Sequence, residues 1–255
     1  NSSIDIQGNI LKNGGENSTL TLKGAGRVQV RNPITATNSG GMNVVLWSDY
    51  DGGDQGGLSI NSNISTGGGH FWAGGSDTVA GSLTWNGLTV GNGGSVGNSG
   101  YNHNAMDLYG NIATSGGHVM LWAGNGYSAG TYGIGGSGTR AINSGAGDIT
   151  LIADDIAGGL IDVTSTGHFT YKPNSNTIAN VAGQLDFSGT ISGNTFTGSG
   201  DTDWLKFNNY NALGGLTLGK ASMTNDIQVY NSIDVNGPIE LLGASIIVNP
   251  GAVLD

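Results

Sequence analysis

A single motif recurs along this chain, and it limits the folds that the chain can adopt. The first copy is LSINSNISTGGGHFWAG (58–74), and the second is MDLYGNIATSGGHVMLWAG (106–124). Their equivalent isoleucines, Ile64 and Ile112, lie 112 − 64 = 48 positions apart. The first half of the motif returns as IQVYNSIDVNGPIELLG (227–243). Recurrence at a period of about 20 to 50 residues indicates a fold that stacks one structural unit on the next.

Within each copy, apolar and polar residues alternate, as they do in 58–60 and 106–108. A period of two places one face of a strand in a core and the other face in water. The strands end after three to five residues, where Asn, Gly, Ser or Thr follows, and no segment has an amphipathic pattern of helical length. We expect Ile64, Ile112 and Ile233 to point into the core at equivalent positions.

The composition agrees with short strands joined by tight turns. The chain has 49 glycines and only 10% charged residues, and strong helix formers are scarce because Glu occurs only twice. These features predict an all-β solenoid with coils of roughly 20–30 residues. The 48-residue spacing would then span two coils, and the chain about ten. Coils about 4.8 Å apart would form a rod on the order of 50 Å long.

Gly-rich segments separate the repeats, at 48–57, 89–104 and 124–140. We interpret them as loops that protrude from the wall of the solenoid; alternatively, they form irregular coils of the solenoid itself. No sharp domain boundary is evident, so 1–255 is predicted to be a single solenoid segment. The least repetitive stretch, YKPNSNTIANVAGQ (171–184), is the candidate for an irregular break within it.

Charge and cysteine content exclude several classes of partner. The net charge is −10, from 18 acidic and 8 basic residues, which argues against nucleic acid and against an anionic membrane surface. No run of about 18 apolar residues is present, so we expect no membrane insertion. The chain has no cysteine, which suits a long chain exported unfolded across two bacterial membranes. Because it begins NSSIDIQGNI, we interpret it as a mature piece or an excised segment of a longer protein.

The repeat style resembles that of a known group of proteins. It is carried by GDITLIADDI (147–156), by the long run from Gly214 to Val253, and by the two copies that contain Gly-Gly-His. These resemble the filamentous-haemagglutinin-like repeat adhesins of Gram-negative bacteria, many of which are exported by two-partner secretion. The resemblance implies a right-handed parallel β-helix, secretion to the cell surface or beyond, and a role in attachment, biofilm or surface display.

Two departures limit what the resemblance carries over. The family's N-terminal secretion signature is not visible, so this segment would belong to the passenger or shaft. The calcium-binding nonapeptide GGxGxDxUx is also absent, so that toxin-type metal site is not expected here.

Two histidines, His70 and His118, occupy equivalent places in the motif. An offset of two coils would separate them by about 10 Å, too far to share an ion that lies about 2.1 Å from each nitrogen. We therefore predict that they are turn residues and that no metal binds there.

Aromatic residues are the first candidates for ligand binding. Trp47, Trp72 and Trp122 follow the apolar part of the motif, where they could stack on sugars or hold coils together. We favour the internal or half-buried stack, because repeated positions in solenoids commonly serve stacking. Trp85 and Trp204 fall outside the motif, and are predicted either to be exposed ligand-binding aromatics or to cap the core.

Three tyrosines, Tyr101, Tyr127 and Tyr132, lie among glycines in the predicted loops. We expect specific binding to lie in these loops, with surface glycans or a host or cell-surface receptor as the partner.

Acidic residues provide the candidates for calcium. Asp49, Asp51 and Asp54 cluster in SDYDGGDQGG, which partly matches a calcium loop but lacks its terminal Glu. The cluster is either a calcium site or, as we favour, a solvated turn, and no other cofactor is predicted. Asp201 and Asp203 form a second acidic pair.

The sequence leaves two classes of function open. The first is a structural or adhesive module, which we favour because the chain repeats without a unique polar cluster. The second is a carbohydrate-binding or carbohydrate-active β-helix, such as a polysaccharide lyase or hydrolase, which needs converging charged side chains. No catalytic motif is visible, so we predict that the chain is not an enzyme. Both ends look like ordinary repeat strands, so further coils or copies of the chain are expected to pack there.

Overall fold

The computed structural model describes most of the chain, namely residues 2–37, 40–53, 56–76, 79–97, 104–124, 126, 132–179 and 184–255. Strands account for 50% of the chain and helix for 3%. In the described residues the helix consists of two short 3-10 turns, η1 (Gly200–Thr202) and η2 (Tyr210–Ala212). The predicted all-β class is confirmed.

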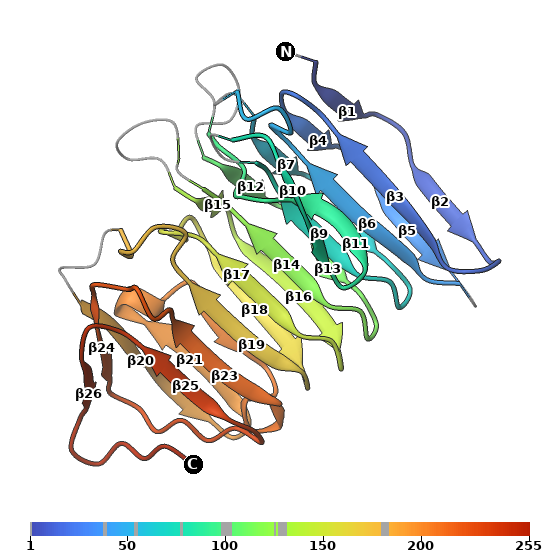
Figure 1. The fold of residues 1–255 in the computed structure, drawn as a ribbon. Helices are drawn as coiled ribbons and strands as arrows, with labels where there is room; N and C mark the ends of the chain where they lie inside the picture. Colours follow the sequence, from blue (N-terminus) through green and yellow to red (C-terminus); the bar gives the residue numbers. More distant parts are fainter. Residues whose placement is uncertain are drawn as a thin grey trace.

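Successive strands enter three different sheets in turn and then return to the first. The first passage consists of β1 (Ile4–Ile6), β2 (Ile10–Asn13) and β3 (Ser18–Lys23). The second consists of β4 (Val28–Val30), β5 (Ile34–Thr37) and β6 (Met42–Trp47), each parallel to its counterpart in the first. One such passage is called a coil below. Figure 1 shows the coils side by side, with the two termini at opposite ends of the stack.

The remaining coils extend the same sheets. The five-stranded sheet continues with β7 (Leu58–Ile60), β12 (Met106–Leu108) and β15 (Ile134–Gly136). The eight-stranded sheet continues with β9 (Phe71–Gly74), β14 (Val119–Trp122), β17 (Ile149–Ile152), β19 (His168–Lys172), β23 (Gly215–Gly219) and β25 (Ile239–Leu242). The eleven-stranded sheet continues with β8 (Ile64–Ser65), β13 (Ile112–Ala113), β16 (Thr139–Gly145), β18 (Leu160–Ser165), β22 (Leu205–Phe207), β21 (Thr195–Ser199), β20 (Gln184–Ser192), β24 (Asp226–Val229) and β26 (Ile246–Val248).

The 48-residue repeat is one coil, and the prediction of two coils is wrong. Leu58 pairs directly with Met106 on the neighbouring strand, and Ile64 pairs directly with Ile112. The extra length comes from the residues between β9 and β12, some of which form a separate two-stranded sheet. For the same reason the eight-stranded sheet marks eight coils in the described chain, fewer than the ten or so predicted.

One continuous hydrophobic core fills the space between the sheets, from Val28 to Val235. Ile64, Ile112 and Ile233 are all buried in it, as predicted. Ile64 and Ile112 are neighbours in the ladder, whereas Ile233 lies in an isolated bridge with Leu254. Alternation along each strand produces this core, because every second residue points inward.

An antiparallel hairpin, β10 (Ser82–Trp85) and β11 (Leu88–Gly91), forms part of the insertion. Its turn is Asn86-Gly87, with φ of 46° and 76°. Two positive φ values define a type I′ turn, for which Asn-Gly is the preferred sequence. The second strand shows that part of 89–104, predicted to be a protruding loop, belongs to a hairpin instead.

The hairpin covers the outer face of the eight-stranded sheet. Trp47 and Trp72 are buried there in a second hydrophobic cluster, together with Val45, Leu88 and Val90. The two indole rings meet edge to face, with centroids 6.4 Å apart. These tryptophans are therefore buried, but outside the coils rather than within them.

The other segments predicted to be loops or a break differ in whether they contain strands. The segment 124–140 contains β15 and the start of β16, so its second half is part of a coil, as the alternative interpretation stated. The segment 48–57 forms a turn as far as it is described. Across 171–184 the stack continues, because β19 pairs with β17 and with β23. The irregularity there is an antiparallel pair, β20 and β21, inserted before β22.

We expect Ile112→Ala to lower the free energy of unfolding by about 2–5 kcal/mol, because Ile112 is enclosed between Ile64 and Ile142 of the adjacent coils. Urea unfolding followed by tryptophan fluorescence measures the change. The matched control is Leu11→Ala, at a side chain that is 63% exposed, which should change stability by less than about 0.5 kcal/mol. Equal losses in the two variants would contradict this account of the core.

Candidate functional site

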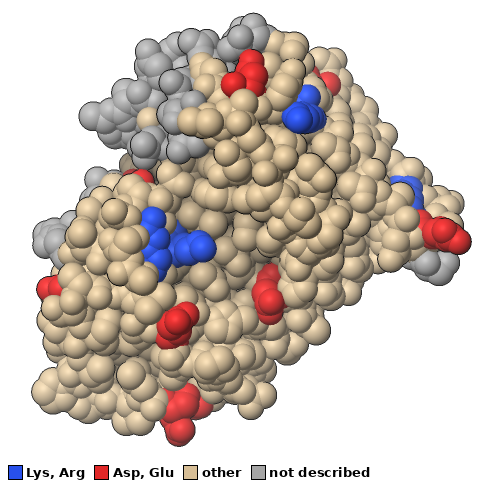
Figure 2. Space-filling view, in the orientation of Figure 1, with Lys and Arg blue, Asp and Glu red and all other residues tan. Residues whose placement is uncertain are grey.

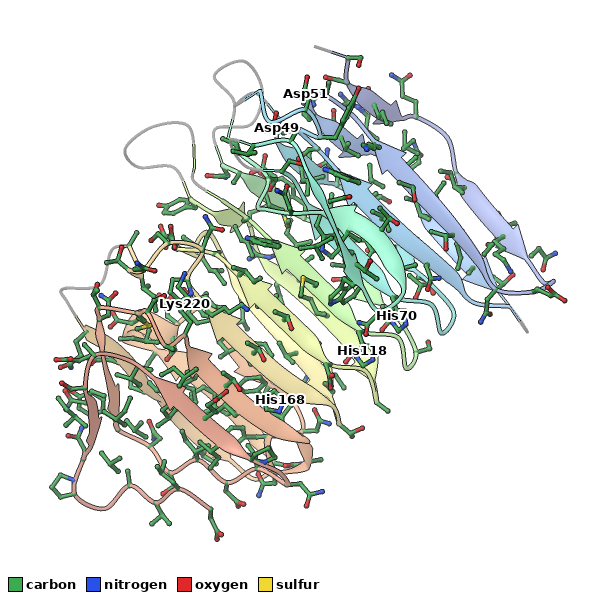
Figure 3. The ribbon with its side chains drawn as sticks, in the orientation of Figure 1. Asp49, Asp51, His70, His118, His168 and Lys220 are labelled. Carbon is green, nitrogen blue, oxygen red and sulfur yellow. The ribbon has the colours of Figure 1, made fainter. Side chains whose placement is uncertain are left out.

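A ladder of polar side chains runs along one corner of the stack, where the chain enters the eight-stranded sheet. The backbone N–H of His118 donates to Nδ1 of His70 at 3.0 Å, and the N–H of Asp148 donates to Nδ1 of His118 at 2.9 Å. The N–H of His168 donates to Oδ1 of Asp148 at 2.8 Å. Asn43 begins the series by accepting the N–H of His70 at 2.9 Å. These residues are called the corner ladder, and Figure 3 shows its three histidines along one edge of the molecule.

The two motif histidines are close together, which corrects the predicted separation of about 10 Å. The rings of His70 and His118 stack with centroids 5.0 Å apart, because the two residues lie in adjacent coils. Each Nδ1 accepts a backbone N–H from the next coil, so this nitrogen is occupied by the fold. Among the described residues no group of three His, Cys, Asp or Glu side chains could hold a metal ion. The hydrogen bonds between adjacent coils give the corner ladder a structural role at this turn.

Burial disfavours a charge on His70. Desolvation lowers the pKa of His70, and the neighbouring His118 lowers it further. A proton on Nδ1 would also remove the acceptor that the N–H of His118 uses. In the folded chain the imidazole of His70 therefore takes up a proton less readily than a free histidine does.

Two of the three predicted calcium residues, Asp49 and Asp51, lie within the described residues. Asp49 is buried, with φ of 49°, and its Oδ1 accepts the N–H of Gly53 at 3.0 Å. Asp51 is exposed, and Asp54 lies outside the described residues. Figure 3 places Asp49 and Asp51 at the same end of the coils. The carboxylate of Asp49 serves the turn.

Of the predicted ligand-binding aromatics, Trp204 caps the core. It is 4% exposed, its ring lies 4.9 Å from that of Tyr171, and its Nε1 donates to the carbonyl of Asp201 at 3.0 Å. The prediction of an exposed ring is wrong there, because Tyr171 from a neighbouring coil covers it. Tyr132 is half-buried, and its backbone N–H donates to Oδ1 of Asn104 at 2.9 Å.

Tyr101 and Tyr127 lie outside the described residues, so the prediction that the Gly-rich loops bind a partner stays a prediction.

Trp85 and Trp122 are both half-buried, and they line a common groove of about 240 Å³. The groove lies on the outer face of the eight-stranded sheet, beyond the edge of the hairpin, and is called the outer groove. Its floor is formed by Met120 and Trp122 of β14 with Ile152 of β17. The covering hairpin buries Trp72 but leaves Met120 and Trp122 half-buried.

The hairpin and the C-terminal coils form the walls of the outer groove. Trp85 lies on the hairpin side, where its ring contacts His70 of the corner ladder, with centroids 5.8 Å apart. On the other side, the Nε1–H group of Trp122 donates a hydrogen bond to Oδ1 of Asn174 at 2.7 Å. Nζ of Lys220 donates to the carbonyl of Asn174 at 2.8 Å.

Two lysines give the outer groove a positive charge. Lys172 and Lys220 line it, and in the described part of the chain neither forms an ion pair with a carboxylate. Desolvation lowers the pKa of Lys220; Asp154 opposes this effect and Lys172 adds to it. Figure 3 places Lys220 on the face toward the viewer, where Figure 2 shows two basic side chains together.

A second, smaller cavity of about 160 Å³ has acidic walls. Asp155, Asp201 and Asp203 line it together with the buried ring of Tyr171. Asp201 is engaged by the fold, because its Oδ2 accepts the backbone N–H of Asp186 at 2.9 Å. Burial raises the pKa of Tyr171, and the carboxylates of Asp155 and Asp154 raise it further, so its hydroxyl stays protonated.

Compared with known protein families, curated proteins and solved structures, the chain matches none of them. The likeness to filamentous-haemagglutinin-like adhesins therefore stays a prediction from the repeat style. No helix in the described part of the chain is long and apolar enough to cross a membrane.

Two patterns in the sequence could have indicated the outer groove. Val119 and Leu121 point into the core, so the period of two places Met120 and Trp122 on the outside. The Asn-Gly pair at 86–87 likewise indicates a hairpin that could border them. Lys172 and Lys220 give no local signal, because only the stacking of β19 and β23 brings them together.

We expect the melting temperature of the protein to fall as the pH is lowered from about 8 to about 5.5. His70 has a folded pKa below its usual value of 6.5, so the unfolded chain takes up a proton first and acid favours unfolding. His70→Asn should reduce this fall, because Asn offers an oxygen acceptor to the N–H of His118 and does not titrate.

The control is His168→Asn, which leaves His70 in place and should keep the fall in melting temperature. Thermal unfolding at the two pH values measures both variants. A full pH effect in His70→Asn would contradict the assignment to this residue.

Proposed function

We propose that the chain is a shaft segment of a secreted, cell-surface bacterial adhesin. In this proposal the coils form a right-handed parallel β-helix that holds binding surfaces away from the cell and serves attachment, biofilm or filament formation. The repeat style and the continuous core of stacked coils support it. No catalytic step is assigned to the chain.

The observation that carries the proposal is the apolar surface of the terminal coil. Ile246, Ile247 and Val248 of β26 are each 40–42% exposed, and Val253 and Leu254 beyond it are exposed to 56% and 42%. In the described chain β26 pairs only with β24, so its other edge is open. An open, apolar strand edge is a template for pairing with another strand.

The opposite end of the stack also has an open strand edge and an exposed apolar side chain. β1 pairs only with β4 among the described strands, and Leu11 of β2 is largely exposed. Terminal repeats of soluble arrays need a polar outer face. Further coils of the same kind, stacked on these edges, would supply the missing cover.

We expect the isolated chain to associate end to end as its concentration is raised. Ile247→Lys should suppress the association, because a lysine on an edge strand opposes pairing with a second strand. Size-exclusion chromatography with light scattering measures the mass of both proteins.

The matched control is Val79→Lys, which makes the same exchange at an exposed valine away from the terminal strands and should associate like the unaltered chain. A chain that stays monomeric at every concentration would contradict the open-ended shaft.

Attachment is tested separately with beads that carry the folded chain. Retention of the beads under flow, on cultured cell layers and on polysaccharide-coated glass, measures adhesion. Beads that carry Ile112→Asp provide the control, because a buried charge disrupts the stack. Equal retention of both kinds of bead would contradict an adhesive role for the folded chain.

A further inference from the structure

We propose that the outer groove binds an acidic sugar, a hexuronate unit of a polysaccharide. The sugar ring would stack on Trp85 and Trp122, and its carboxylate would lie between Lys172 and Lys220. This inference rests on the proposed function, for which it names the class of ligand.

The apolar part of the groove suits the face of a sugar ring. Met120 and Trp122 lie on β14 and Ile152 lies on the next strand, at a strand spacing of about 4.8 Å. Two floor side chains can therefore underlie one six-membered ring. Aromatic rings present an electron-rich face that attracts the C–H groups of a sugar. Trp85, held against His70, adds a second aromatic wall.

The volume of the outer groove indicates a small ligand. Pockets for drug-sized molecules measure about 300–1,000 Å³, and this groove measures about 240 Å³. It therefore accepts one ring of a chain whose other units lie outside, along the surface. An exposed groove of this kind suits an inner unit of a polysaccharide.

The charge of the groove indicates an anion. The chain has 18 acidic and 8 basic residues, yet two lysines and no carboxylate line this groove. Asp154 is close enough to influence Lys220, but its Oδ1 accepts the N–H of Ser175 at 2.7 Å outside the groove. A bound carboxylate would relieve the repulsion between the two ammonium groups.

The groove is also organised in advance. Asn174 is fixed by two hydrogen bonds, one from Trp122 and one from Lys220. These bonds orient the indole and the ammonium group before any ligand arrives, which lowers the entropy cost of binding. Nδ2 of Asn174 donates to no described residue, so it can donate to a sugar hydroxyl.

The experiment titrates the full chain with three probes: an oligomer of galacturonate, a galactose oligomer of equal length, and sodium acetate. Tryptophan fluorescence and calorimetry report binding. We expect saturable binding of the galacturonate oligomer, at least about tenfold weaker binding of the neutral oligomer, and no saturable binding of acetate. Equal affinity for the acidic and neutral oligomers, or no saturable binding of either, would overturn the proposal.

Variants locate the site. Trp85→Ala, on the exposed hairpin, and Lys220→Met should each weaken galacturonate binding by at least about tenfold. The control Lys12→Met removes the same charge from β2, away from the groove, and should leave binding unchanged. Circular dichroism checks that each variant is folded. An equal loss of affinity in Lys12→Met would show that the charge of the whole protein, and not the outer groove, attracts the sugar. That result would overturn the assignment of the site.

The titration requires neither end-to-end association nor bead attachment. A chain that stays monomeric but binds galacturonate would retain this inference and lose the shaft. A chain that associates end to end but binds no sugar would retain the shaft and lose this inference.

Discussion

The structure depends on parallel, in-register pairing between successive coils. No coil can bury its apolar row alone, so each is stable only when its backbone hydrogen bonds and inward side chains meet those of its neighbours. The same register aligns like residues along the stack, as with Ile64, Ile112 and Ile142. It also places His70 directly beside His118. The hydrophobic core and the corner ladder are thus two results of one constraint.

Because register is set between coils, residues can be inserted within a coil without disturbing it. The hairpin of β10 and β11 lengthens one coil to 48 residues, and Leu58 still pairs with Met106. Extra loop length adds little to the entropy cost of closing a coil. The insertion also covers Trp47 and Trp72 on the outer face, which stabilises that wall from outside.

Repetition and insertion therefore have separate roles in this chain. The repeated coils give length, a continuous core and apolar edges that further coils can cover. The outer groove arises where the inserted hairpin stops, between Trp85 and the lysines of the later coils. The groove therefore depends on a local departure from the repeat and not on the repeat itself.

The sequence by itself determined the all-β class and the inward positions of Ile64, Ile112 and Ile233, because the period of two and the Gly-rich turns are local properties of the chain. It did not determine the length of a coil, since that depends on which strands pair. The burial of Trp204 against Tyr171 and the meeting of Trp122 with Asn174 were also decided by tertiary structure. These pairs are distant in the sequence, and only the stacking of the coils brings them into contact.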